Sequence, residues 1–248
     1  ALTVTSADVV TPGTCVNKYS IARTYTVTDI CGNSSTKTQT ITVDDDIAPA
    51  ISSIPADVTV HCSSDVPAPN TAAVVATDNC TGALTVTSAD VVTPGTCVNK
   101  YSIARTYTVT DICGNLSSKV QTITVDDDIA PVLSEAPANV TVECNAVPVA
   151  ATLTATDNCD AAPEVTYKEV RTDGVCPSTY TLTRTWTATD ACSNSASKTQ
   201  VIKVQDTTAP VLSEAPADVT VECNAVPVAA TLTATDNCDA APVVTYKE

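Results

Sequence analysis

The chain is poor in aromatic residues, and this limits the core that it can build. Its 248 residues include no Phe and no Met, one Trp and seven Tyr. A hydrophobic core must therefore consist mainly of Val, Ile, Leu and Ala, and such a core is thin. Small domains with thin cores are marginally stable unless covalent links support them.

Basic residues are also scarce. Twelve Lys and Arg stand against 28 Asp and Glu, which gives a formal charge of −16. Nucleic acids and anionic membranes bind surfaces rich in Lys and Arg, so we expect neither as a partner. No apolar run approaches the length of a membrane-spanning helix, and we expect no direct membrane insertion within this sequence. An acidic surface suits solubility and divalent cations.

The sequence repeats itself with a period of about 80 residues. Residues 1–48 match residues 83–130 at all but three positions, and residues 131–169 match residues 210–248 at all but two. Both ends fall inside the same stretch of the repeat. We therefore expect the chain to be a window cut from a longer array.

Aligning the repeats on their Ala-Pro dipeptides defines the domains. Two complete repeats occupy residues 49–130 and 131–209. Residues 1–48 form the C-terminal part of a repeat, and residues 210–248 form the N-terminal part of another.

Period-two alternation and Thr/Val-rich composition predict an all-β fold. In the repeat 49–130 turn signals separate five expected strands, which are Asp57–Cys62, Ala72–Asn79, Ala83–Val92, Lys100–Asp111 and Ser118–Asp126. Short strands with frequent turns are typical of a β-sandwich. An odd number of alternating strands puts the start and the end of a repeat at opposite ends, so we expect repeats to follow head to tail as a rod.

One charged residue falls on an apolar strand face. In the expected strand Lys100–Asp111, alternation places Arg105 with Ile103 and Tyr107. We expect a structural role for Arg105, with its aliphatic stem packed and its head at a sheet edge.

Candidate catalytic residues are nearly absent. His61 is the single histidine, and the equivalent positions of the other repeats hold Glu143 and Glu222. No nucleophile elbow, phosphate-binding loop or paired-carboxylate motif occurs. We predict that the chain is not an enzyme and that it has no catalytic residue.

Twelve cysteines, four per repeat at nearly fixed spacing, predict disulfides and an oxidising compartment. Metal binding would need closely spaced Cys-x-x-Cys pairs, and none occurs. Alternating strands bring Cys62 level with Cys97 at one end of a repeat and Cys80 level with Cys113 at the other, whereas the remaining pairings would span a whole strand. The predicted disulfides are Cys62–Cys97, Cys80–Cys113, Cys144–Cys176 and Cys159–Cys192, which leaves Cys15, Cys31, Cys223 and Cys238 without partners.

Acidic residues gather where one repeat ends and the next begins. Carboxylates of the linkers would face those of the Thr-Asp-Asn-Cys and Thr-Asp-x-Cys segments of the following repeat, and such oxygen clusters suit Ca²⁺. The alternative is that each Asp before a Cys makes an Asx-turn and that the linker carboxylates are solvated. The candidate metal ligands are Asp44, Asp45, Asp46, Asp78, Asp111, Asp126, Asp127, Asp128, Asp157, Asp190, Asp206 and Asp236.

Four motifs resemble the hyalin-repeat (HYR) family of extracellular immunoglobulin-like modules. They are Asp206–Pro210, Pro216–Cys223, Ala234–Cys238 and Trp186–Asn194. The repeats are more similar still to those of SprB-like gliding and surface adhesins of Bacteroidetes, which the type IX secretion system exports. The resemblance implies display at the cell surface, in adhesion or as a stalk. Ser193 departs from the family pattern, which has Gly there, and this puts the local turn in doubt.

The sequence thus predicts tandem immunoglobulin-like β-sandwich repeats in a long extracellular fibre or stalk. Near-identical tandem copies serve length and multivalency, and further copies of the repeat are the expected partners besides an unidentified surface glycan or protein. The alternative is a non-catalytic binding module of a secreted polysaccharide-degrading enzyme. A glycan-binding face would need exposed aromatic residues, and these are few.

Overall fold

The computed structural model describes residues 1–247. Within these residues every regular element is a β-strand, apart from the short 3-10 turns Ser63–Asp65, Thr71–Ala73 and Cys144–Ala146. None of the described residues forms a helix that is long and apolar enough to span a membrane. The chain divides into two compact units, Ala1–Asp128 and the residues from Ile129 onward.

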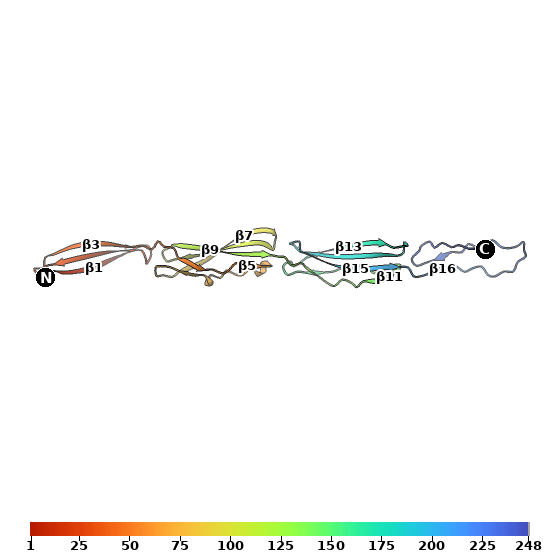
Figure 1. The fold of residues 1–248 in the computed structure, drawn as a ribbon, viewed down its shortest axis with the longest axis horizontal. Coiled ribbons are helices and arrows are strands. Elements are labelled where there is room, and N and C mark those ends of the chain that lie inside the picture. Colours follow the sequence, from red (N-terminus) through yellow and green to blue (C-terminus); the bar gives the residue numbers. More distant parts are fainter. Residues whose placement is uncertain (248) are drawn as a thin grey trace. The chain divides into compact units, whose positions relative to one another are not determined.

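The repeat 49–130 forms two sheets (Figure 1). The larger sheet has the strand order β5-β9-β8-β7, and the smaller one pairs β4 with β6. All pairings are antiparallel except that of β5 with β9. The strands are β4 (Ala50–Ser53), β5 (Val58–Val60), β6 (Val75–Thr77), β7 (Thr85–Cys97), β8 (Lys100–Thr110) and β9 (Leu116–Asp126). This arrangement confirms the predicted all-β class.

The five strands expected from alternation are present, with two differences. Strand β4 was not predicted, because its four residues lie between Pro49 and Pro55 and are too few to show a period. The second expected strand shortens to Val75–Thr77, because Asn70 caps a 3-10 turn at Thr71–Ala73 by accepting a hydrogen bond from Ala73 N.

The other segments repeat parts of this plan. In residues 1–48, β1 (Thr3–Pro12), β2 (Tyr19–Thr28) and β3 (Ser34–Val43) form an antiparallel sheet equivalent to β7, β8 and β9. The repeat 131–209 has a four-stranded sheet of order β11-β15-β14-β13 and a pair β10-β12, and residues 210–247 contain a pair β16-β17. These strands are β10 (Val132–Leu133), β11 (Val140–Glu143), β12 (Ala155–Thr156), β13 (Glu164–Asp173), β14 (Tyr180–Thr189), β15 (Ser195–Gln205), β16 (Val211–Leu212) and β17 (Ala234–Thr235).

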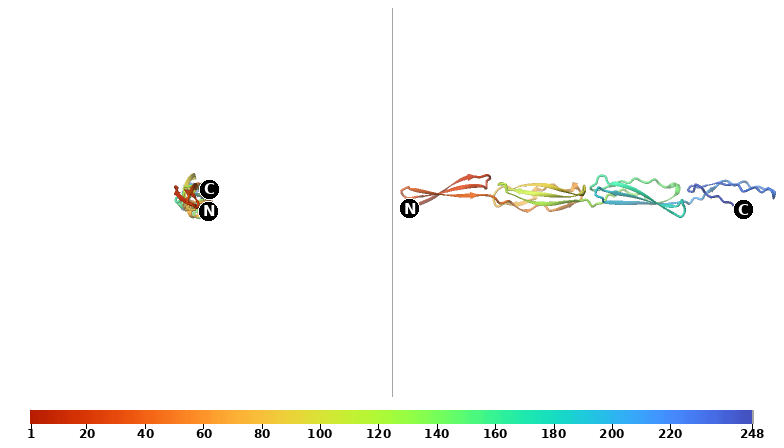
Figure 2. Two further views of the ribbon diagram at one scale, coloured as in Figure 1. Left: turned by 90° about the vertical axis from the view of Figure 1, so that its left-hand side faces the viewer. Right: turned by 90° about the horizontal axis from the view of Figure 1, so that it is seen from above.

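Within each unit the complete repeat and the partial one lie end to end rather than side by side. In the first unit, Figures 1 and 2 show the hairpins of residues 1–48 following on from one end of the repeat 49–128. In the second unit, residues 210–247 follow the repeat 131–209 in the same manner. Head-to-tail order is therefore visible inside each unit.

The core of the repeat 49–130 lies along the inner face of β8 and β9. Tyr107, Val109, Ile123 and Val125 are fully buried, and Ile103 is nearly so. The segment between β5 and β6 covers this face, and its Asn70 N–H donates a hydrogen bond to the Tyr107 hydroxyl. In the repeat 131–209 the largest core residue is Trp186, which packs with Leu133, Leu153 and Ala188.

A buried guanidinium interrupts each core strip, as the alternation predicted. Arg105 is 3% exposed, and it makes paired hydrogen bonds of 2.8 and 2.9 Å to Asp90 on β7 and one of 2.7 Å to the Pro67 carbonyl. Arg184 is equally buried, and it binds Glu169 and the Pro148 carbonyl. The paired contact holds the pKa of Asp90 below its usual value. Both arginines thus join the larger sheet to the segment that covers it.

The structure corrects the predicted disulfides. Cys15 bonds to Cys113 and Cys144 bonds to Cys238, with Cα atoms 5.2 and 5.7 Å apart. The predicted pairs Cys80–Cys113 and Cys144–Cys176 are therefore wrong, as is the expectation that Cys15 and Cys238 have no partner. Cys31 and Cys223 are free thiols as predicted, and Cys80 and Cys176 are also free. Cys62, Cys97, Cys159 and Cys192 are disulfide-bonded.

The physical reason for the error is the end-to-end packing. Strand direction places cysteines correctly at the two ends of a repeat, but it does not say which cysteine at that level is nearest. In both observed pairs the nearest cysteine belongs to the neighbouring repeat. Distance along a strand excludes the pairings that would span a whole strand, but it does not decide between a partner in the same repeat and one in the neighbouring repeat.

We predict that Asp90→Ala destabilises the repeat 49–130 by about 2 kcal/mol, because the buried Arg105 loses its counter-ion. The value lies below that for a fully buried pair, since the Asp90 side chain is 34% exposed. The measurement is urea unfolding of the full chain. The matched control is Asp8→Ala, which removes the equivalent partner of the more exposed Arg23 and should change stability much less. Equal effects of the two substitutions would contradict a burial-dependent role for Arg105.

Candidate metal centre at a repeat junction

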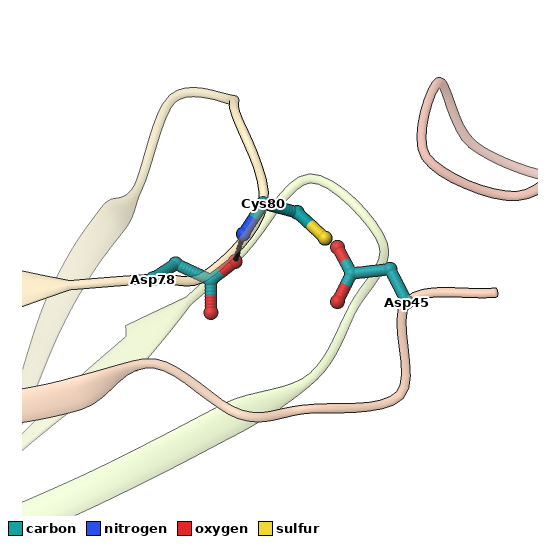
Figure 3. A group of neighbouring side chains, drawn as sticks. All are labelled: Asp45, Asp78 and Cys80. Atoms are coloured by element: carbon teal, nitrogen blue, oxygen red, sulfur yellow. Dashed lines mark hydrogen bonds between the residues drawn. The ribbon is translucent and has the colours of Figure 1, made fainter. Parts of the chain in front are cut away.

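Two carboxylates and a thiol from different segments meet where residues 1–48 join the repeat 49–130. Asp45 lies in the linker that follows β3, Asp78 follows β6, and Cys80 comes two residues later. Figure 3 shows the three side chains directed toward one another. One oxygen of each carboxylate and the Cys80 sulfur lie within 4.8 Å of one another. The junction therefore concentrates negative charge, as the acidic linker predicted.

Asp45 is the most deeply buried member of this group, at 1% exposed. Its Oδ2 accepts a hydrogen bond of 3.2 Å from Asn17 Nδ2, and its backbone carbonyl accepts one of 2.9 Å from Asn115 Nδ2. Its Oδ1 is buried and has no hydrogen-bond partner in the protein. A buried carboxylate oxygen without a partner is costly, so this position favours a positively charged ligand.

Asp78 makes the Asx-turn that the sequence offered as the alternative to metal binding, but the turn occupies only one of its oxygens. Its Oδ2 accepts a 3.0 Å hydrogen bond from the Cys80 N–H, which makes the expected Asx-turn. Its Oδ1 is buried without a hydrogen-bond partner, like Oδ1 of Asp45. The turn thus uses one oxygen and leaves the other for a further contact.

Asp111, in contrast, is held entirely by its own turn. One oxygen accepts the N–H groups of Cys113 and Asn115, and the other accepts Asn115 Nδ2. Burial opposes the charge of Asp111, but these hydrogen bonds outweigh it and lower its pKa. Asp190 makes the same three contacts in the repeat 131–209. The Asx-turn therefore accounts for all the hydrogen bonds described for these two carboxylates, which share one geometry.

The remaining linker carboxylates of the first unit mostly pair with basic side chains. Asp44 contacts Lys18 at 2.9 Å, and Asp126 contacts Lys100 at the same distance. Asp128 lies 3.1 Å from the His61 ring, and Asp46 is exposed. Asp127, the equivalent of Asp45, is likewise 1% exposed. The middle residue of each Asp triplet is thus the one that the fold buries.

The second unit has a related group at the junction of residues 131–209 with residues 210–247. Oxygens of Glu143 and Asp206 lie within 4.8 Å of each other and of the Cys238 sulfur. Asp236 uses one oxygen to accept the N–H groups of Cys238 and Asp239, and its other oxygen is buried without a hydrogen-bond partner. Asp157 makes the same type of turn with Cys159 and Asp160.

Glu143 was not among the metal ligands predicted from the sequence. Its position in the repeat could have indicated it, because Glu143 is equivalent to His61 at the end of an edge strand, and His61 contacts the linker residue Asp128. A residue at this place faces the following linker in both repeats.

Burial raises the pKa of the Cys80 thiol, and the carboxylates of Asp45, Asp78 and Asp111 raise it further, so the thiol stays protonated at neutral pH. The equivalent residue Cys238 forms a disulfide with Cys144. A thiolate is therefore not a recurring donor at these junctions, and the donors that recur are carboxylate oxygens. Such donors favour hard cations over zinc or copper.

The fold is that of tandem immunoglobulin-like β-sandwich repeats. Residues 50–125 match a family model described as an HYR-like domain with 4 cysteines, which supports the resemblance to hyalin-repeat modules for this repeat. The doubtful turn keeps its form, because Ser193 adopts a φ of 71° where Gly114 has 90°. No curated protein sequence matches the chain significantly.

Several solved structures of cadherin type are similar to the chain. The cis-dimer structure of protocadherin gammaB7 EC3-6 is 17% identical with a TM-score of 0.30, and the match covers 93% of this chain and 76% of that one. The protocadherin GammaB4 extracellular domain is 18% identical with a TM-score of 0.34, over 96% of this chain and 48% of that one. Drosophila N-cadherin EC1-4 is 12% identical with a TM-score of 0.28, over 76% and 58%. Similarity at this level carries no argument about function.

We predict that Cys80 reacts with iodoacetamide at pH 8.5 more slowly than the exposed Cys176, because its raised pKa keeps it protonated. Asp45→Asn should accelerate the reaction of Cys80, since it removes a nearby negative charge. Asp46→Asn changes charge equally at an exposed site and serves as the control. Mass spectrometry of the alkylated peptides measures the rates, and an Asp45→Asn rate equal to that of the control would contradict the electrostatic cause.

Proposed function

We propose that this chain is a structural and adhesive segment of an extracellular surface fibre or stalk. The observation that carries the proposal is covalent linkage between consecutive repeats. Cys15 of the partial repeat 1–48 bonds to Cys113 of the repeat 49–130, and Cys144 of the repeat 131–209 bonds to Cys238 of residues 210–247. Disulfides persist in oxidising compartments, which favours an extracellular location. Links from repeat to repeat suit a protein that must span distance under load.

The direction of the strands supports the same function. Strand β5 near the start of the repeat 49–130 runs parallel to β9 at its end, so the chain arrives at one end of the repeat and departs from the other. Repeats built in this manner propagate a fibre.

The buried charged groups support a structural role rather than catalysis. Arg105 and Arg184 bind carboxylates and carbonyls of their own repeats. His61 contacts Asp128 and is half exposed. We therefore propose a non-enzymatic function, in which these charged groups hold each repeat together.

Surface display is tested with antibodies raised against residues 49–130. We expect them to label intact cells that produce the full protein, because a stalk repeat lies outside the outermost membrane. An antibody against a cytoplasmic protein is the control for cell integrity. Labelling that appears only after permeabilisation would overturn the proposed location.

We further propose that the junctions bind Ca²⁺. Oδ1 of Asp45 and Oδ1 of Asp78 are both buried without hydrogen-bond partners, in one cluster. Two desolvated carboxylates at such spacing repel each other, and a divalent cation relieves the repulsion. Water and backbone oxygens would complete the six to eight ligands that Ca²⁺ takes. The ion would order the linker and join two repeats more rigidly.

Calorimetric titration of the full chain with Ca²⁺ tests this site. We expect a heat of binding, and a rise in the free energy of unfolding of about 2.7 kcal/mol when free Ca²⁺ is 100 times the dissociation constant. Asp45→Asn and Asp78→Asn should each weaken binding at this junction, whereas Asp46→Asn, at an exposed position of the same linker, should leave it unchanged. No heat, together with identical melting in chelator, would leave the carboxylates without a metal role.

A further inference from the structure

The sheet of residues 1–48 has an open edge. Its strand order is β1-β2-β3, and among the described residues no strand pairs with the outer edge of β3. The equivalent strand β9 has a partner there, because β5 runs parallel to its outer edge. An unpaired edge presents backbone N–H and C=O groups that can pair with another strand. The edge of β3 is therefore a candidate binding site for an extended segment.

The apolar face beside this edge is also uncovered. Val43 on β3 is only half-buried, whereas the equivalent residue Val125 on β9 is 3% exposed or less and lies in the core. Tyr25 on β2 is 40% exposed, and its equivalent Tyr107 is fully buried. The difference marks the place that β5 and the segment after it occupy in the complete repeat.

The pairing of β5 with β9 defines the register that a strand would take on β3. Val60 lies level with Val125, and the two strands run in the same direction. If this register continues, Cys62 is level with Asp127, because each lies two residues further along its strand. Asp127 is equivalent to Asp45. A strand like β5 that docked on β3 would thus place its final cysteine level with Asp45.

A free thiol lies at this level of the first unit. Cys80 is a free cysteine, and its sulfur lies within 4.8 Å of a carboxylate oxygen of Asp45. Figure 3 shows the two side chains directed toward each other. Oδ1 of Asp45 is buried there without a hydrogen-bond partner. A cysteine that ended a strand on β3 would therefore arrive beside Cys80.

The second unit contains the same arrangement in completed form. There β11 runs parallel to β15, and Cys144 at the end of β11 bonds to Cys238, which is equivalent to Cys80. Asp206 is equivalent to Asp45, and one of its oxygens lies within 4.8 Å of the Cys238 sulfur. All of these contacts lie within that unit. A strand that ends in a cysteine thus fills the equivalent site in another repeat.

We propose that the open edge of β3 binds the first strand of another copy of this repeat, and that Cys80 forms a disulfide with the cysteine that ends this strand. The ligand is an extended Asp-Val-Thr-Val-x-Cys segment that pairs parallel to β3. Its Asp has a partner on β3, because Asp57 accepts a hydrogen bond from the Thr122 N–H in the complete repeat, and Thr40 is equivalent to Thr122. Neither calcium binding nor location at the cell surface is needed for this docking.

The bond to Cys80 forms by thiol–disulfide exchange when the incoming cysteine is carried as a mixed disulfide with a small thiol. The Cys80 thiolate attacks the cysteine sulfur of the ligand, and a new S–S bond forms between them. The S–S bond to the small thiol breaks, and that thiol leaves as a thiolate with the electron pair. The proton of Cys80 passes to water, so the mixed disulfide is the only co-reactant.

A synthetic peptide of residues 55–62, carried as a mixed disulfide with thionitrobenzoate, tests the docking on the full chain at pH 8.5. Mass spectrometry measures the rate at which each free cysteine becomes linked. We expect this peptide to link Cys80 about tenfold faster than a scrambled peptide that keeps the final Cys, because pairing raises the local concentration of its sulfur. The exposed Cys176 should react equally with both peptides. Equal rates at Cys80 would overturn the proposal.

Substitutions in the peptide leave the folding of the chain unaffected. Asp57→Ala in the peptide should slow the linkage of Cys80, because the Thr40 N–H loses its acceptor. Pro55→Ala lies before the strand, and it should leave the rate unchanged. An Asp57→Ala rate equal to that of the Pro55→Ala control would contradict the register derived from β5 and β9.

Amide hydrogen exchange separates strand pairing from simple capture of a thiol. In the chain linked to the peptide at Cys80, amides of residues 39–43 on β3 should exchange more slowly than in the chain linked to the scrambled peptide. Hydrogen bonds to the docked strand are the physical cause. Linkage at Cys80 with unchanged exchange along β3 would show capture without pairing and would sink the proposed edge site.

Discussion

The covalent joint between consecutive repeats is the constraint on which the rest of this structure depends. Each complete repeat buries only a narrow strip of apolar side chains along β8 and β9 or their equivalents, with a single Trp in the whole chain. A disulfide that closes a loop of 98 residues, as Cys15–Cys113 does, removes on the order of 4–5 kcal/mol of unfolded-state entropy in the chain-entropy model. That is comparable to the whole stability of a small domain. The stability of one repeat is thus shared with its neighbour.

The small number of apolar core residues also explains why charged groups are buried. A strip of Val and Ile cannot cover both faces of the larger sheet, and the aliphatic stem of Arg105 fills part of it. Its guanidinium then fixes Asp90 on the neighbouring strand and the Pro67 carbonyl in the covering segment. The buried charge at the junction differs from Arg105 in its hydrogen bonding. One oxygen of Asp45 accepts a hydrogen bond from Asn17, and the other has no hydrogen-bond partner. Arg105 therefore completes a hydrogen-bond network within one repeat, whereas Asp45 keeps one carboxylate oxygen without a hydrogen bond at the junction between two repeats.

Strand positions, the buried face of β8 and the role of Arg105 could all be predicted, because each follows from alternation along a single strand. Strand β4 could not, because four residues between prolines show no period. The Asx-turns of Asp78 and Asp111 are local and were foreseen, but their different remaining oxygens depend on Asn115 and on the preceding linker. The disulfide partners were missed for the same reason. Local chemistry specifies the end of the repeat at which a group lies, and only packing against the next repeat specifies what it meets.

This division between local and inter-repeat interactions also identifies the positions of a repeat that cannot change independently. A junction works only if the end of one repeat fits the beginning of the next, so two cysteines, a buried linker Asp and an Asx-turn must keep their places in both partners at once. A change at Cys113 alone leaves Cys15 of the preceding segment without its partner. A change at Asp45 alters the surroundings of both Asn17 and Asn115, which lie on either side of the joint. Residues that face solvent within a repeat carry no such restriction. The most constrained positions of the array are therefore at its joints, where load, charge and covalent bonds coincide.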